Sequence, residues 1–176
     1  MRNLLLMSLL FGGCTTTFLA KSGSVETVTI RTETPRYEFE VETLLVAGDD
    51  AKDLGAILEN DFSLNVNATR FLNDSESADK PATLRIVFQQ DEGGTHEETV
   101  EVWPEDGPVT AAMANWFDAD CISNQRECEV MGEVHIEMVD TGRYQLEVQP
   151  RLILRTEKGS RPVGTRISLD WKLKEE

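Results

Sequence analysis

The sequence predicts a mainly β domain in which antiparallel hairpins form one or two packed sheets, accompanied by two short helices. Three observations support this fold class. Alternating apolar and polar residues recur in runs rich in β-branched side chains, and short segments of Gly, Pro, Asp and Asn separate these runs. Two other segments repeat apolar residues at helical spacing. The expected architecture is therefore sandwich-like or α+β.

The first predicted hairpin joins residues 25–32 to residues 37–46 through the turn Glu33-Thr34-Pro35-Arg36. Closing this turn places Val28 opposite Val41, so apolar side chains share one face of the hairpin. The alternating residues Glu38, Glu40 and Glu42 then form the opposite face.

The middle of the chain is expected to alternate between helices and strands. Residues 49–60 and 109–117 repeat apolar side chains at helical spacing and predict the two short helices. Residues 61–71 alternate and predict a strand. Residues 83–90 and 96–103 predict a second hairpin around Asp91-Glu92-Gly93-Gly94.

The last third predicts three consecutive antiparallel strands at residues 129–139, 143–156 and 161–174. The turn Asp140-Thr141-Gly142 suits a three-residue hairpin loop, because Gly142 can adopt a left-handed conformation. In this register the apolar side chains of all three strands share one face: Val134, Ile136, Met138, Tyr144, Leu146, Val148, Leu152, Leu154, Val163, Ile167, Leu169, Trp171 and Leu173.

The same register generates two candidate sites on the opposite face. His135, Glu147 and Asp170 fall in one cross-strand row, where two carboxylates beside an imidazole could bind a divalent metal or perform acid–base catalysis. The alternative is a solvated sheet face. Arg151 falls opposite Arg166, which raises the question of an anion or a lipid headgroup between them.

Charge is distributed unevenly along an acidic chain. The formal net charge is −15, which argues against binding to a nucleic-acid backbone. Residues 26–140 carry 7 basic and 27 acidic side chains, whereas residues 141–176 carry 8 basic and 5 acidic ones. Either basic C-terminal strands lie beside acidic ones, or the surface is bipolar and orients the domain toward a partner.

The N-terminus has the pattern of a secretory signal peptide, with a basic start, a short apolar run and small residues. The segment Leu10-Phe11-Gly12-Gly13-Cys14 resembles the lipobox of bacterial lipoproteins. That resemblance implies cleavage before Cys14 and lipidation of this cysteine, with residues 1–13 as the signal, 14–24 as a tether and 25–176 as one globular domain. Thr15 after the cysteine resembles the signal for the outer membrane. Cleavage after Ala20, or an uncleaved anchor, is the alternative.

Export makes a disulfide between Cys121 and Cys128 the expected state of the remaining two cysteines. The chain has no G-x-S-x-G, H-E-x-x-H or P-loop motif, so no catalytic centre is indicated and no cofactor is expected.

The expected function is therefore that of a non-catalytic, lipid-anchored envelope protein. It would face the periplasm from the outer membrane, or be soluble there or secreted, and would act as an accessory or adaptor for another envelope component. The alternative is a metal-dependent binder or enzyme that uses His135, Glu147 and Asp170.

Overall fold

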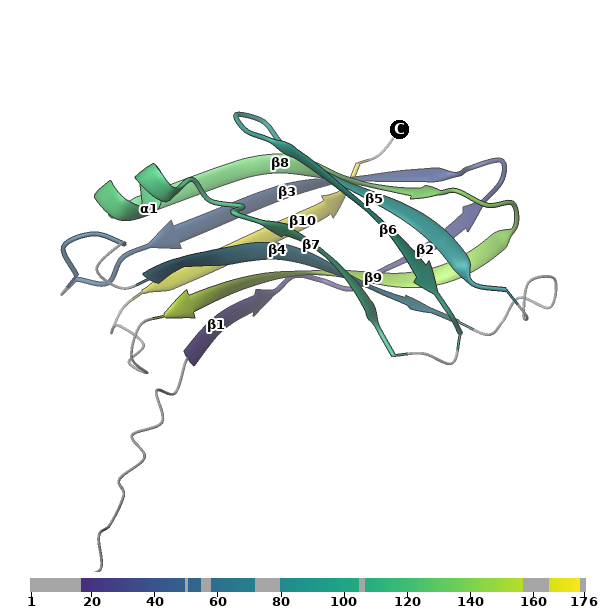
Figure 1. Cartoon of the computed structure of the whole chain (residues 1–176), viewed down its shortest axis with the longest axis horizontal. Coiled ribbons are helices and arrows are strands. Elements are labelled where there is room, and N and C mark those ends of the chain that lie inside the picture. Colours follow the sequence, from purple (N-terminus) through teal and green to yellow (C-terminus); the bar gives the residue numbers. More distant parts are fainter. Residues whose placement is uncertain are drawn as a thin grey trace, which may run out of the picture.

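Two antiparallel five-stranded sheets pack face to face (Figure 1). The computed structural model describes residues 17–49, 51–54, 58–71, 80–104, 107–156 and 165–174. The first sheet comprises β1 (Thr17–Ser22), β2 (Glu26–Arg31), β4 (Leu58–Arg70), β7 (Val109–Ala114) and β9 (Arg143–Thr156). The second comprises β3 (Arg36–Val46), β5 (Ala82–Gln90), β6 (Thr95–Val102), β8 (Glu127–Met138) and β10 (Arg166–Leu173).

The strand order is that of a jelly roll. The second sheet runs β10-β3-β8-β5-β6, and the first runs β1-β9-β4-β7, with β2 also paired to β9. Each early strand therefore pairs with a late one: β2 with β9, β3 with β8, β4 with β7 and β5 with β6. These four pairs form a long two-stranded antiparallel ribbon. When such a ribbon folds over so that its strands divide between two sheets, the fold is a jelly roll. The predicted sandwich-like β fold is confirmed.

Alternation along each strand builds the core. In β5, every second residue from Ala82 to Phe88 is buried, and the residues between them are partly exposed. Side chains of a strand point alternately to its two faces, so one face of each sheet meets the other sheet and one meets solvent. The largest fully buried side chains include Trp116, Tyr144, Phe39, Phe88 and Phe117.

β1 and β2 are two parts of one edge, interrupted opposite Pro150 of β9. Proline has no N–H to donate to a neighbouring strand. The Pro150 carbonyl accepts a hydrogen bond from the Gly23 N–H at 3.0 Å, while the Gln149 side-chain amide donates to the Gly23 carbonyl at 3.1 Å. A Cβ at Gly23 would lie 2.6 Å from Pro150 Cγ. A glycine at the break therefore allows the edge to pass a proline.

Trp116 connects the end of β7 to the second sheet. Its Nε1 donates to Thr43 Oγ1 at 2.8 Å, and that hydroxyl donates to the Val130 carbonyl at 2.9 Å. The ring approaches β8 at Gly132, where a Cβ would lie 3.0 Å from Trp116 Cη2 and 2.3 Å from the Gln89 carbonyl oxygen. The absence of a side chain at Gly132 thus lets the buried indole and the β5 backbone come close to β8.

The predicted disulfide is confirmed and fastens the helix α1 (Ala119–Asn124) to the start of β8. Cys121 and Cys128 are bonded, with their Cα atoms 5.9 Å apart. The Asp118 carboxylate caps the helix by accepting from the Asp120 N–H at 2.8 Å. Between the helix and β8, Arg126 donates to the carbonyls of Ala51 and Gly48. The cross-linked segment therefore also holds the connection that follows β3.

The two predicted helices are wrong. Residues 52–54 form bends, and β4 begins at Leu58, inside the range predicted as helix 49–60. Residues 109–114 are β7, in which Ala111 and Met113 are buried. Spacing of apolar residues at i and i+4 fits both a helix and a strand, and pairing with β4 satisfies the backbone of β7.

The predicted strand pairings are partly wrong, although the strand positions are close. β5 and β6 form the predicted hairpin. β2 and β3 are joined by the predicted turn but lie in different sheets, so Val28 and Val41 are buried in one core from opposite sides. The last three strands do not pair with one another either, because β9 lies in the first sheet and β10 pairs with β3.

The predicted tether also differs from the structure. Residues 17–22 form β1, which pairs with the C-terminal half of β9. Residues 14–24 are therefore not a free linker throughout, and the fold starts within three residues of Cys14. Cys14 itself lies outside the described residues. Within the described part of the chain, no helix has the length and apolar character needed to span a bilayer.

Substitution of Gly132 by alanine is expected to destabilise the fold, because the new Cβ would collide with the Gln89 carbonyl and the Trp116 ring. A loss of about 2 kcal/mol in the free energy of unfolding is typical of such overpacking, and urea denaturation measures it. Gly107→Ala is the matched control, because a Cβ there meets nothing within 4 Å. Equal stability of the two variants would contradict this account of Gly132.

Candidate functional site

The predicted metal row is not assembled. His135 lies on β8 and Asp170 on β10, with β3 between these two strands of the second sheet, whereas Glu147 lies on β9 in the first sheet. The prediction assumed that β8, β9 and β10 pair in sequence, and that register is wrong. Among the described residues, no group of three or more His, Cys, Asp and Glu side chains is close enough to hold a metal ion.

The predicted arginine pair is also separated. Arg151 lies opposite Ser22 and Asn65 in the first sheet, and Arg166 lies opposite Val46 in the second. Both side chains are exposed. An anion bound between these two residues is therefore not supported by their positions.

Around His135 the structure brings together a different set of charges. The His135 side chain is 11% exposed, its Nε2 lies 3.0 Å from a Glu133 carboxylate oxygen, and its Nδ1 lies 3.8 Å from Glu38. The Arg36 guanidinium contacts Nδ1. Arginine can only donate hydrogen bonds, so Nδ1 is the acceptor and the proton of a neutral ring lies on Nε2, toward Glu133.

Ion pairs extend from this point across the second sheet. Arg85 of β5 bridges Glu97 on β6 at 2.6 Å and Glu137 on β8 at 3.0 Å. Lys174 reaches Glu133 at 2.7 Å from beyond the end of β10. These contacts raise the pKa of Lys174 and lower the pKa of Glu97, in each case chiefly through the side-chain hydrogen bond to its partner. These groups are partly or fully solvent-exposed, so each pair contributes little to stability.

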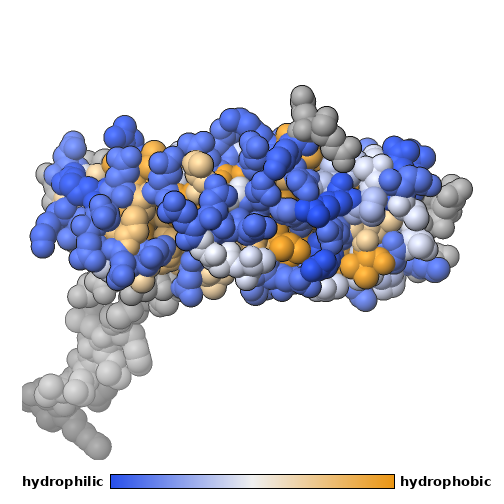
Figure 2. Space-filling view, turned by 90° about the horizontal axis from the view of Figure 1, so that it is seen from above, coloured by the Kyte–Doolittle hydropathy of each residue, from blue (hydrophilic) through white to orange (hydrophobic). Residues whose placement is uncertain are grey.

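Acidic side chains predominate on this outer face. By strand alternation, the outward acidic residues are Glu38, Glu40, Glu42, Glu97, Glu101, Glu127, Glu129, Glu133, Glu137 and Asp170, and the outward basic ones are Arg36, Arg85, Arg166, Lys172 and Lys174. The outer face of the first sheet instead carries Arg31, Arg143 and Arg151 with Glu147. Figure 2, seen from above, shows a mostly hydrophilic surface with small apolar patches. Among the side chains that the structure describes, the outer faces of the two sheets therefore differ in charge.

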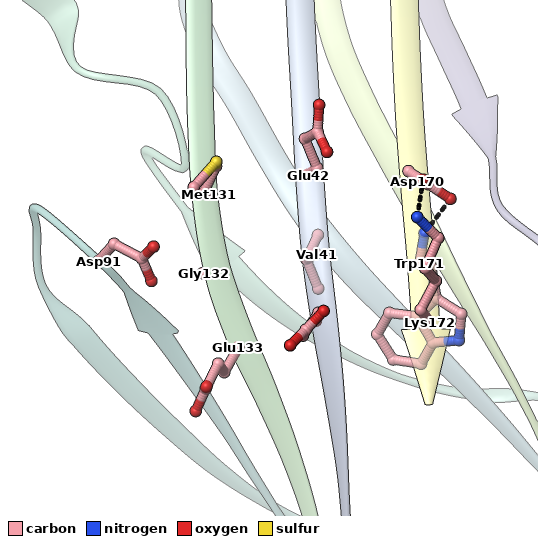
Figure 3. Close-up of a pocket in the computed structure, with 10 residues that line it drawn as sticks. Val41, Glu42, Asp91, Met131, Gly132, Glu133, Asp170, Trp171 and Lys172 are labelled. Carbon is pink, nitrogen blue, oxygen red and sulfur yellow. Dashed lines mark hydrogen bonds and ion pairs between the residues drawn. The ribbon is translucent and has the colours of Figure 1, made fainter. Parts of the chain in front are cut away.

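Two hollows lie on the acidic face, and we call them together the acidic groove. One, with a volume of about 270 Å³, is lined by carboxylates of β3, β8 and β10 and by Lys172 (Figure 3). The other, of about 630 Å³, lies between the β5–β6 turn, the start of α1 and β8, and includes Glu129. They share Asp91 and Met131, and Met131 is 50% exposed.

The register places like charges directly opposite each other in this groove. Glu40 faces Glu133 across β3 and β8, and Glu42 faces Asp170 across β3 and β10. Such pairs are destabilising. Lys174 and Lys172 balance Glu133 and Asp170. Glu40, Glu42, Glu129 and Asp91 form no ion pair within 4 Å of another described residue. Glu40 and Glu42 interact with the two lysines only at longer range, Glu40 with both and Glu42 with Lys172.

The groove therefore offers carboxylate oxygens to a cation, together with an exposed thioether side chain. Carboxylates accept hydrogen bonds and attract positive charge, and methionine adapts its shape to apolar groups. Sequence reasoning placed Glu38, Glu40 and Glu42 on one face but did not find this groove. The alternation of Glu129, Glu133 and Glu137 is visible in the sequence, yet its position beside β3 depends on a pairing between distant strands.

Comparisons with known proteins leave the family open. No protein-family model matches the chain, and no curated protein matches it. Among solved structures, the crystal structure of the Yersinia pseudotuberculosis-derived mitogen is similar over 84% of this chain and 96% of that chain, with 9% sequence identity and a TM-score of 0.30. Nothing about this chain is inferred from a likeness of that degree.

Lys172→Ala is expected to raise the pKa of Asp170 toward the ordinary value of an aspartate. The Lys172 ammonium lies 2.8 Å from the carboxylate, and its hydrogen bond is the main cause of the lowered pKa of Asp170. A carboxyl-carbon NMR titration measures the change, and Lys174→Ala is the control that leaves Asp170 unchanged.

The sign of the associated stability effect follows from linkage. Because the folded-state pKa of Asp170 is lowered, this pair favours the folded state above the ordinary aspartate pKa and loses its effect as the pH falls through the folded-state value. An Asp170 titration that is the same in the wild type and in Lys172→Ala would show that the pair does not form in solution.

Proposed function

We propose that this chain is a non-catalytic, lipid-anchored envelope protein that binds another envelope component through the acidic outer face of its second sheet. The observation that carries the binding surface is the set of carboxylates in the acidic groove that lack an ion-pair partner among the described residues. The lipobox-like segment ending at Cys14 supports the anchor.

The position of β1 supports attachment close to a membrane. β1 begins at Thr17, three residues after Cys14, and three extended residues span about 10 Å. The start of β1 lies at the same end of the sandwich as α1 and the end of β9 (Figure 1). A lipid on Cys14 would therefore hold this end of the domain near the bilayer surface, which suits an accessory protein of a membrane-associated assembly.

The disulfide supports export from the cytoplasm. Cysteine pairs persist as disulfides in oxidising compartments such as the bacterial periplasm and are rare in the reducing cytosol. Cys121 and Cys128 are bonded, and the hydrogen bonds of Arg126 between them hold the connection after β3. A structural disulfide of this kind agrees with an envelope or secreted location.

The charge of the face determines the chemistry of the partner. A surface with unbalanced carboxylates repels phosphate backbones and attracts Lys and Arg side chains. Lys and Arg carry long apolar stems that can cover an exposed methionine while their charged ends reach carboxylates. The proposed partner is therefore a protein segment rich in Lys or Arg, which crosses Met131 and contacts Glu40 and Glu42.

Intact mass spectrometry of the membrane-extracted protein tests the anchor. The expected mass is that of a chain starting at Cys14 plus its acyl groups, and Cys14→Ser is expected to remain uncleaved and without them. More than one acyl chain gives stable membrane attachment, at about 0.8 kcal/mol per buried methylene. Recovery of an unmodified full-length chain from the cytosol, with Cys121 and Cys128 reduced, would overturn the proposal.

Neutralising the groove tests the partner surface. In the triple variant Glu40→Gln/Glu42→Gln/Glu129→Gln, in-cell cross-linking to the partner is expected to fall about tenfold, because complementary charges mainly speed association. The matched control is Glu26→Gln/Glu33→Gln/Glu147→Gln, which removes as many charges away from the groove. Wild-type cross-linking should also weaken as salt is raised. Equal cross-linking by the two triple variants would show that the partner binds elsewhere.

A further inference from the structure

The strand β10 forms one edge of the second sheet and has a second side that no described strand occupies. It pairs with β3 alone. Just beyond the end of β10, the Lys174 N–H donates to the Glu38 carbonyl at 2.8 Å. Every second residue of a strand directs its N–H and C=O groups to the same side, so the even-numbered residues of β10 direct these groups toward β3. The N–H and C=O groups of Ile167, Leu169, Trp171 and Leu173 therefore point toward the free side.

The structure closes part of this edge with a side chain. The Trp171 N–H donates to its neighbouring Asp170 carboxylate at 3.0 Å. β1 belongs to the other sheet and lies beside β10 without pairing with it, and a Cβ on Gly23 would lie 3.5 Å from Trp171 Cβ. An unpaired strand edge is a template for another strand.

We propose that a second copy of this chain occupies the free edge, with the two β10 strands antiparallel and Trp171 opposite the partner's Trp171. The contact is symmetric about a two-fold axis, as in most protein dimers. The Trp171 N–H exchanges its bond with Asp170 for one with the partner's backbone. The two second sheets then form one continuous sheet.

The charges on the outer face narrow the choice of register. Pairing through the odd-numbered residues allows several two-fold positions, and each brings a different set of outward side chains together. Centring the pair on Trp171 places Asp170 opposite the partner's Lys172, and this happens twice because of the symmetry. Centring on residue 170 would oppose two aspartates. Centring on residue 172 would oppose two lysines, and centring on Leu169 would oppose Lys172 to the partner's Arg166. Centring on Ser168 would also oppose unlike charges, Asp170 and the partner's Arg166, so the inner face has to distinguish these two registers.

The inner face agrees with the same register. Leu173 is 40% exposed at the end of β10, although it belongs to the alternation that buries Leu169 and Trp171. Centring on Trp171 places Leu173 opposite the partner's Leu169. The exposed side chain of each copy thereby gains an apolar neighbour, which is favourable.

The dimer also has a consequence for the acidic groove and the anchor. Asp170 and Lys172 line the groove, so pairing through β10 brings the two grooves to neighbouring positions on one continuous face. A two-fold axis perpendicular to the paired sheets leaves both first sheets, and with them both β1 strands, on the same side. If the lipid anchors of the proposed function are present, both can enter one membrane while both acidic faces point away from it.

Cysteine cross-linking of the full chain in its native membranes tests the pairing. Asp170→Cys and Lys172→Cys are made as separate variants and expressed either singly or together. A disulfide-linked dimer is expected only on co-expression, because opposite residues are close enough to bond whereas Asp170 is offset from the partner's Asp170 by two positions. Ser168→Cys with Lys172→Cys is the register control and should not cross-link. The proposal would be overturned if either variant expressed alone gave as much cross-linked dimer as the two expressed together, or if co-expression gave none.

Sedimentation of the detergent-extracted full chain tests the charge pairing. Lys172→Glu places two like-charge pairs in the interface and is expected to weaken dimerisation about tenfold. The exchange variant Asp170→Lys/Lys172→Asp restores opposite charges and should recover the wild-type dissociation constant. Circular dichroism confirms that both variants are folded. A wild-type chain that stays monomeric at all concentrations, or an exchange variant no better than Lys172→Glu, would contradict the dimer whether or not Cys14 carries lipid.

Discussion

The position of β8 between β3 and β5 is the constraint on which the candidate site depends. This pairing sets Glu133 beside Glu40 and sets His135 beside Glu38, and it connects the ion pairs of Arg85 with the rest of the face. It also requires a glycine at position 132, where the β5 backbone and the Trp116 ring come closest to β8. A single glycine thus allows the backbone approach inside the sandwich, while Glu133 next to it carries an outward charge and Met131 an exposed thioether.

The sequence predicted the alternation within each strand better than the pairing between strands. The alternation of Val134, Leu146 and Trp171 correctly indicated which side chains turn inward, because period-two burial is a property of each strand alone. The register between strands was wrong wherever it assumed that consecutive strands are neighbours. In a jelly roll, the chain crosses to the other sheet at most of its connections, and the short turn after β2 has no signal that distinguishes a crossing from a hairpin.

This distinction explains why the candidate site was out of reach of sequence reasoning. The groove combines Glu40 and Glu42 of β3 with Glu129 and Met131 of β8, which are far apart in the chain. Each alternating acidic run is visible on its own, but only the β3–β8 pairing sets them side by side. The disulfide was predictable because its two cysteines are close in sequence and form an even pair.

The acidic face can be understood as a surface whose charge pattern is unfavourable for the isolated domain. Opposing carboxylates such as Glu40 and Glu133 destabilise a sheet by roughly 0.2–1 kcal/mol per pair, a cost that glutamine at one position would remove. Natural sequences commonly depart from the most stable choice at sites of function. A cationic partner would supply further counter-charge. The proposed dimer would extend the same argument, because Asp170, which pairs with Lys172 and the Trp171 N–H within its own chain, would then also face Lys172 of a second copy. The residues that balance poorly within one domain are those that a neighbour could balance.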